Sequence, residues 1–136
     1  EDQILKLTNN GNRFVMAQKF IENVYQGDKR VTIVNGKILG VLLRVPPKDS
    51  FIAYTGGGAT VETTTLTDRE TAIAQKVALF LKAHNIFWAG LDIIDGYLSE
   101  INITSPSLLA AANTRLNIHL ERALWNEVEA TFGQNS

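Results

Sequence analysis

The sequence predicts an α+β domain in which helices pack on an antiparallel sheet. Two β-rich regions each turn at an Asn-Gly or Asp-Gly pair, and a helical pattern lies between them. These pairs favour tight hairpins because both residue types tolerate positive φ. Strands followed by a helix, strands again and then helices are typical of an α+β fold. A chain of 136 residues, 45% of them apolar, has the size and composition of one globular domain.

The first half of the chain contains three β-rich segments and a long connection. Arg13–Phe20 follows a turn at residues 9–12 and is predicted to be a strand. Lys29–Val34 and Lys37–Val45 flank Asn35-Gly36 and are predicted to form a hairpin, which the following prolines end. Residues 48–66 form a Gly- and Thr-rich connection of a length that is usually functional or disordered.

The second half of the chain begins with a helix and continues with another hairpin. Thr67 and Glu70 have the spacing of a capping box. Helical periodicity then predicts a buried face of Ile73, Val77, Phe80 and Leu81. Ile86–Ile94 and Tyr97–Ile103 flank Asp95-Gly96 as the second hairpin.

Two further helices are expected after the second hairpin. Ser105-Pro106 fits an N-cap followed by proline, which predicts a short helix ending near Ala112. A last helix is predicted from near Asn117, and its inner side would consist of Leu120, Ala123, Leu124, Val128 and Phe132.

The composition excludes several classes of function. The net charge is −1 and the charges are mixed, so the sequence has no basic stripe for a nucleic-acid backbone. Cysteine is absent, which excludes disulfides, thiolate zinc sites and a cysteine nucleophile. No apolar run approaches the roughly 20 residues that cross a bilayer. His84 and His119 are far apart in the sequence and are interpreted as surface or helix-end residues.

The register of the second hairpin decides which side chains share a face. With a two-residue turn, Ile94 would pair with Tyr97, and Glu100 would face away from Asp92. With a three-residue loop and a left-handed Gly96, the apolar residues of both strands fall on one face instead. We adopt the second register, because a slip by one residue would scatter that apolar face.

In this register Asp92, Glu100 and Asn102 lie together on the polar face, with nothing basic between them. Neighbouring carboxylates repel unless a cation lies among them. Carboxylate and amide oxygens suit a hard ion such as Mg²⁺ rather than Zn²⁺. The same three residues also suit the solvent-facing side of a half-exposed sheet, and their spacing alone leaves both interpretations open.

The segment from Gly90 to Pro106 resembles the magnesium-binding segment of bacterial glutathione synthetases. That family has Gly-Leu-Asp-Ile-Ile, a short turn and Leu-x-Glu-Ile-Asn-Val-Thr-Ser-Pro, and this chain has GLDIIDGYLSEINITSP. Three earlier segments, MAQKFI from Met16, QGDKRV from Gln26 and LRVP from Leu43, resemble further family segments in the same order. The four segments span residues 12–108, and ordered matches are more specific than any single one.

The resemblance implies the nucleotide- and metal-binding half of an ATP-grasp ligase that joins γ-glutamylcysteine to glycine through an acyl phosphate. It implies Mg²⁺ or Mn²⁺ at Asp92, Glu100 and Asn102, with ATP as co-substrate. Arg30 and Arg44 would be the catalytic residues that hold the transferring phosphoryl group, a task suited to a planar charged fork.

The remaining expected site residues fall into two groups. Gln18, Lys19, Phe20 and Ile21 would edge the adenine, and Asp28 would lie near the ribose or phosphates. Gly57, Gly58, Thr104 and Ser105 would face the substrates. From the residues alone, the Gly56–Gly58 loop is equally a mobile lid or a flexible connection, and Ser105 is equally a helix cap.

The chain departs from the family pattern in its Gly-rich loop. The aligned region, Tyr54 to Thr60, lacks the arginine of the family's Ala-Gly-Gly-Arg-Gly segment. This departure leaves open a non-catalytic ATP-grasp-like module that binds nucleotide, or a related ligase with other amino-acid substrates. Sequence upstream of the chain would separate these possibilities.

We expect residues 1–136 to form one domain, the C-terminal half of an ATP-grasp domain in a longer parent chain. The chain starts at Glu1 without an initiator Met, and the resemblance implies an N-terminal domain and a preceding ATP-grasp half in addition to these 136 residues. The 136 residues alone are therefore expected to be inactive. The resemblance further implies a cytoplasmic, homo-oligomeric parent enzyme that acts on small molecules and binds neither nucleic acid nor membrane.

Overall fold

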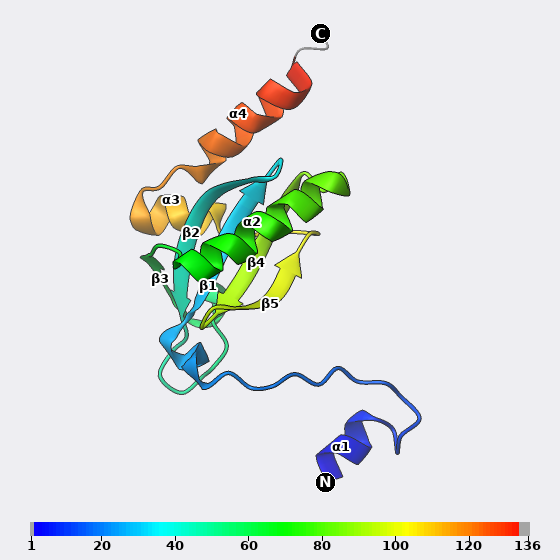
Figure 1. The fold of residues 1–136 in the computed structure, drawn as a ribbon. Helices are drawn as coiled ribbons and strands as arrows, with labels where there is room; N and C mark the ends of the chain where they lie inside the picture. The colour runs from blue at the N-terminus through cyan, green and yellow to red at the C-terminus, as the bar shows by residue number, and fades with distance from the viewer. Residues whose placement is uncertain (1, 134–136) are drawn as a thin grey trace.

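A computed structural model describes residues 2–133 and contains one antiparallel sheet of five strands (Figure 1). The strand order is β3-β2-β1-β4-β5. The strands are β1 (Asp28–Val34), β2 (Lys37–Val45), β3 (Thr60–Thr63), β4 (Trp88–Ile94) and β5 (Tyr97–Asn102). The α+β fold with two Gly-turned hairpins is confirmed, and the central pairing of β1 with β4 joins the two hairpins.

The strand outside the two hairpins is β3, not the predicted segment Arg13–Phe20, so the prediction of a strand at Arg13–Phe20 is wrong. Thr60–Thr63 pairs with the outer side of β2 and lies inside the Gly- and Thr-rich connection at residues 48–66. Residues 13–20 are extended and exposed, because no strand of the described chain lies beside them. In Figure 1 this segment leads away from the sheet to α1 (Asp2–Leu7), which lies apart from the rest of the molecule.

Both hairpins have the same construction. Asn35-Gly36 and Asp95-Gly96 are two-residue turns with positive φ at both positions. The register then shifts by one residue on the return strand of each hairpin. The predicted three-residue loop at residues 94–96 is therefore wrong, since Ile94 pairs with Tyr97.

A bulge in the second hairpin places Asp92, Glu100 and Asn102 on one face of the sheet, as predicted. Ile93 pairs with Leu98 and Asp92 pairs with Glu100, so Ser99 is the extra residue. The Ser99 hydroxyl donates to the backbone oxygen of Asp92 at 3.0 Å. A two-residue turn without this extra residue would place Ser99 opposite Asp92 and turn Glu100 to the other face.

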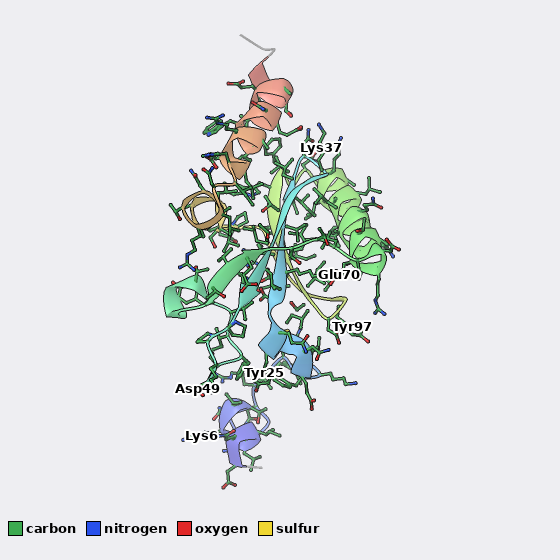
Figure 2. The ribbon with its side chains drawn as sticks, turned by 90° about the vertical axis from the view of Figure 1, so that its left-hand side faces the viewer. Lys6, Tyr25, Lys37, Asp49, Glu70 and Tyr97 are labelled. Atoms are coloured by element: carbon green, nitrogen blue, oxygen red, sulfur yellow. The ribbon has the colours of Figure 1, made fainter. Side chains whose placement is uncertain are left out.

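Helix α2 (Asp68–Ala83) covers one face of the sheet. The Thr67–Glu70 capping box is present, and the Glu70 carboxylate also accepts from Lys29 of β1 at 2.6 Å. Figure 2 shows the sheet nearly edge-on, with Glu70 on the side of α2 that faces it. Small residues let the helix approach the sheet closely, and the buried core on this side is Val31, Ile33, Ala74, Ala78, Leu81, Ala89, Leu91 and Ile93. Phe80 was predicted in this core but is 54% exposed.

Helices α3 (Leu109–Leu116) and α4 (Leu120–Phe132) pack on the other face, around β2 and β3. Their core is Leu42, Val61, Leu108, Ala112 and Leu120.

The predicted helix start at Ser105-Pro106 is wrong, because Pro106 is buried and α3 begins three residues later, after Leu108 with φ 105°. The predicted last helix begins at Leu120 rather than near Asn117, which ends α3 in a left-handed conformation. The inward-facing prediction for Phe132 is also wrong, since that side chain is 57% exposed.

Two short 3-10 helices precede strands of the sheet: η1 (Glu22–Gln26) lies before β1 and η2 (Thr55–Gly57) lies before β3. Among residues 2–133, none of the helices has the length and apolar character needed to cross a membrane.

Candidate functional site

The candidate site is a row of charged side chains on the sheet face opposite α2. The register places Asp28 beside Arg44, Arg30 beside Asp92, and Asp92 beside Glu100. Alternate residues of a strand share a face, so all five side chains lie on the same side of the sheet. The sequence left open whether Arg30 and Arg44 share a face, and the first hairpin shows that they do.

Two ion pairs and a bridging contact join four of these side chains. Arg30 donates to both carboxylate oxygens of Asp92, at 2.5 and 3.0 Å. Arg44 donates to both oxygens of Asp28, at 2.6 and 2.7 Å. The Nη2 of Arg44 also lies 3.0 Å from Oδ2 of Asp92, so it bridges the two carboxylates. The exposed fractions of Asp28, Arg30 and Asp92 are 8%, 6% and 5%, so these pairs are largely withdrawn from water.

The two carboxyl groups respond differently to this environment. Burial raises the pKa of Asp28 above its ordinary value, although its pairing with Arg44 acts in the opposite direction. Burial also acts to raise the pKa of Asp92, but hydrogen bonds and charge from Arg30, and then from Arg44, hold that pKa below its ordinary value. Asp92 is therefore the more firmly ionised carboxylate, because two guanidinium groups share it.

Both arginines contact Asp92 from the β1 side of β4, whereas Glu100 and Asn102 lie on its β5 side. Arg30 and Arg44 lie against Asp92 because β1 is the central strand and runs beside both β2 and β4. The sequence of the second hairpin alone could not reveal this neighbour.

A cavity of about 760 Å³ opens in front of the charged row. Its floor includes Asp28, Arg30, Arg44, Asp92 and Glu100. Its walls come from residues 18–21 and 51–54, two segments that lie outside helices and strands. The volume lies within the usual range of small-molecule sites, roughly 300–1,000 Å³. The cavity thus unites the predicted Gln18, Lys19, Phe20 and Ile21 with the predicted arginines.

Aromatic rings form part of the wall. The Phe20 ring packs edge-on against Phe51, at a centroid distance of 5.8 Å, and against Tyr25 at 6.2 Å. The sequence interpretation missed the wall residues Phe51, Ile52 and Tyr54. The signal was present, since large apolar side chains in an otherwise Gly- and Thr-rich loop have no predicted core to enter.

Other predicted site residues lie outside the lining of this cavity. Gly57 and Gly58 are exposed in and after η2, and Thr104 and Ser105 are exposed beyond β5. Asn102 is half-buried, and its Nδ2 lies 3.4 Å from Oδ2 of Asp92. The structure brings Asn102 to the metal-ligand candidate Asp92, and the roles of the other four residues stay predictions.

The donor atoms of the site fit Mg²⁺ in their chemistry. Asp92 and Glu100 are directly opposite carboxylates, Glu100 is exposed, and the Asn102 amide is adjacent to Asp92. Within residues 2–133 no group of three or more His, Cys, Asp or Glu side chains is placed to hold a metal ion. Carboxylate and amide oxygens are ligand types that Mg²⁺ accepts, and Mg²⁺ usually takes further ligands from water and phosphate.

Solved structures show which fold the chain has. The D-alanine–D-alanine ligase of Bacillus anthracis complexed with ATP aligns with a TM-score of 0.55 and 17% identity, covering 95% of this chain and 46% of that chain. The ATP-grasp ligase PsnB complexed with a minimal precursor aligns with a TM-score of 0.59 and 18% identity, covering 93% of this chain and 43% of that chain. At these identities the likeness shows the fold, which is that of ATP-grasp proteins.

Sequence comparison identifies the family within that class. Residues 2–116 match the family described as "Prokaryotic glutathione synthetase, ATP-grasp domain". The glutathione synthetase of Coxiella burnetii is 44% identical over 102 residues, or 74% of this chain and 32% of that protein. The glutathione synthetase of Xanthomonas campestris is 32% identical over 129 residues, or 94% of this chain and 41% of that protein. The chain belongs to the prokaryotic glutathione synthetase ATP-grasp family, as its motifs predicted, and spans 32% to 41% of the length of these relatives.

Proposed function

We propose that this chain is the ATP- and magnesium-binding portion of a carboxylate–amine ligase that joins γ-glutamylcysteine to glycine. Residues 1–136 would be the C-terminal half of the ATP-grasp domain in a longer parent protein. The family membership supports the ligase class. The observation that carries the proposal is the row of Asp28, Arg44, Arg30, Asp92 and Glu100 on the floor of the cavity.

The proposed reaction has two steps. A substrate carboxylate oxygen attacks the γ-phosphorus of ATP, which forms an acyl phosphate and releases ADP. The amine nitrogen of glycine then attacks the acyl carbon, which forms the amide and releases phosphate and a proton. Phosphoryl and acyl transfer of this kind depend mainly on positioning and on neutralising charge.

Arg30 and Arg44 would bind the transferring phosphoryl group and the acyl phosphate. Both residues line one cavity, and a planar guanidinium suits bidentate binding of phosphate oxygens. Asp28 would orient Arg44, because both of its carboxylate oxygens already accept from that side chain. Asp28 would then have two roles: it would position Arg44, and it would lie near the ribose or phosphates as predicted.

The walls of the cavity would bind the rest of the nucleotide. Residues 18–21 would edge the adenine through their backbone groups, with the Phe20 ring packed beside it. Asp92, Glu100 and Asn102 would hold Mg²⁺ or Mn²⁺, which would neutralise and align the ATP phosphates. Gly57, Gly58, Thr104 and Ser105 remain proposed for the substrates, at the periphery of the cavity.

The test compares ATP-dependent turnover in the full-length parent protein and in its Asp92→Asn, Glu100→Gln double variant. We expect γ-glutamylcysteine- and glycine-dependent ADP release to fall by at least about a hundredfold, as when transition-state charge stabilisation is removed. The matched control is Asp49→Asn with Glu129→Gln, two exposed carboxylates outside the cavity lining. Equal turnover in the double variant and the control would rule out the metal assignment.

A second candidate function follows from the loop at residues 54–60, which carries no cationic side chain. The missing cationic side chain is compatible with a related ligase that uses other amino-acid substrates, or with a non-catalytic nucleotide-binding module. ADP release with other amino acids but not with this pair would favour the related ligase. ATP binding without turnover on any acid and amine would favour the module.

We further propose that the parent protein is a cytoplasmic homo-oligomer. Its relatives are glutathione synthetases, whose substrates here would be small molecules. Cell fractionation and light scattering of the full-length protein test the two statements separately.

A further inference from the structure

Asp92 is the metal-ligand candidate of the site, and both of its carboxylate oxygens already accept hydrogen bonds. Arg30 occupies one oxygen at 2.5 Å and the other at 3.0 Å. The second oxygen also has Nη2 of Arg44 at 3.0 Å. A cation bound directly to Asp92 must displace these donors or lie against their positive charges.

The charges of the four paired side chains cancel. Asp28 and Asp92 contribute two negative charges, and Arg30 and Arg44 contribute two positive charges. Glu100 adds one exposed carboxylate, which water screens more strongly. A bare divalent cation therefore meets little net attraction at this site, although each carboxylate alone would attract it.

We propose that Arg30 and Arg44 keep a divalent cation from Asp92 until nucleotide phosphates take over the two guanidinium groups. This inference rests on the proposed function, in which the same cavity binds ATP. It makes the binding of metal and nucleotide interdependent: the cation enters with the nucleotide rather than before it. Such coupling is reciprocal, so the metal also tightens nucleotide binding.

The geometry makes this exchange of partners local. Arg44 is anchored to Asp28 by two hydrogen bonds, so it has only its 3.0 Å contact to Asp92 to release. Arg30 has both of its hydrogen bonds on Asp92, and it is the donor that must turn toward the phosphates. Both side chains already line the cavity, so a phosphate there competes directly with Asp92 for them.

The test measures binding of Mn²⁺ alone to the full-length parent protein by electron paramagnetic resonance. We expect Arg30→Gln to bind Mn²⁺ at least about tenfold more tightly than the unmodified protein, because one adjacent positive charge is removed. The matched control, Arg122→Gln, changes an exposed arginine of α4 and should leave Mn²⁺ affinity unchanged. Adding Asp92→Asn to Arg30→Gln should abolish the gain.

A second variant guards against a folding defect in Arg30→Gln. Asp28→Asn with Arg44→Gln removes both members of the other pair, which avoids leaving an unpaired buried charge. This double variant leaves the net charge of the row unchanged and removes only the 3.0 Å contact of Arg44 to Asp92, so it should bind Mn²⁺ alone more tightly than the unmodified protein but less tightly than Arg30→Gln. Unchanged Mn²⁺ affinity in both folded variants would overturn the inference and leave the proposed function standing. A gain that persists with Asp92→Asn would overturn the inference and the metal assignment together.

Discussion

The side chain of Arg30 packs against Gly90 while its guanidinium donates to Asp92. A Cβ at position 90 would lie 3.1 Å from Cδ of Arg30 and 3.3 Å from its Nη1. Gly90 is two residues before Asp92 on β4, and both lie on the face of the charged row. The glycine of the Gly-Leu-Asp motif is therefore needed for the space that it leaves above the sheet.

Gly90→Ala is expected to displace Arg30 from Asp92. The added methyl group is tight against Arg30 and against Pro106, whose Cβ would be 3.3 Å away. Overpacking of this kind usually costs roughly 1–3 kcal/mol. We expect lower ATP-dependent turnover together with a stability loss in that range, measured by ADP release and urea unfolding. Gly133→Ala is the control, because its Cβ would meet Glu129 only at 3.9 Å; unchanged turnover in Gly90→Ala would refute the role of this space.

Arg44→Gln is expected to destabilise the protein more than the Asp28→Asn, Arg44→Gln double variant does. The single change leaves Asp28 as an unpaired buried carboxylate, a loss of roughly 3–5 kcal/mol. Removing both partners leaves no buried charge without a counter-charge at this pair. Urea unfolding of the three proteins decides the matter, and a double variant less stable than Arg44→Gln would contradict the prediction.

Glu70 is expected to make stability depend on acidity. Burial acts to raise its pKa, but hydrogen bonds from Lys29 and Thr67 hold the pKa below the ordinary value of 4.5. Its contribution is therefore complete above the ordinary pKa and is lost as pH falls through the lower pKa of the folded state. Between about pH 7 and pH 3, the free energy of unfolding should fall less in Glu70→Gln than in the unmodified protein. Glu129→Gln is the exposed control, and parallel pH profiles for all three proteins would disprove the assignment.

Phe51→Ala is expected to weaken ATP binding. Its ring supports Phe20 edge-on at 5.8 Å on the cavity wall. An aromatic pair of this kind contributes roughly 0.5–1.5 kcal/mol, so the KM for ATP should rise about 2- to 10-fold with little change in kcat. Phe80→Ala, which removes an exposed ring on α2, is the control. An unchanged KM would remove Phe51 from the nucleotide site.

Local signals in the sequence predicted both hairpins and the start of α2. Asn35-Gly36 and Asp95-Gly96 adopt the positive φ values that make them turn signals, and Thr67 caps its helix. Those features depend on a few consecutive residues. The position of the bulge could not be predicted from such local features. A two-residue turn at Asp95-Gly96 is compatible with a hairpin with or without the extra residue Ser99, and only the observed pairing of Asp92 with Glu100 distinguishes the two.

The contacts of Arg30 and Arg44 with Asp92 could not be predicted from local sequence signals. Arg30 and Asp92 are 62 positions apart and meet only because β1 lies next to β4. The same reason explains the two strand errors. Arg13–Phe20 has the composition of a strand but no partner in the described chain, whereas the short Thr60–Thr63 segment has the edge of β2.

The floor and the walls of the cavity should exchange with solvent on different timescales. Asp28 and Arg30 lie on the central strand, whose amide protons we expect to exchange only when the sheet opens. Residues 18–21 and 51–54 lack such pairing and can open while the sheet stays intact. The residence time of a bound nucleotide would then be set by the walls, so substitutions in these segments could tune its release without altering the lifetime of the folded protein.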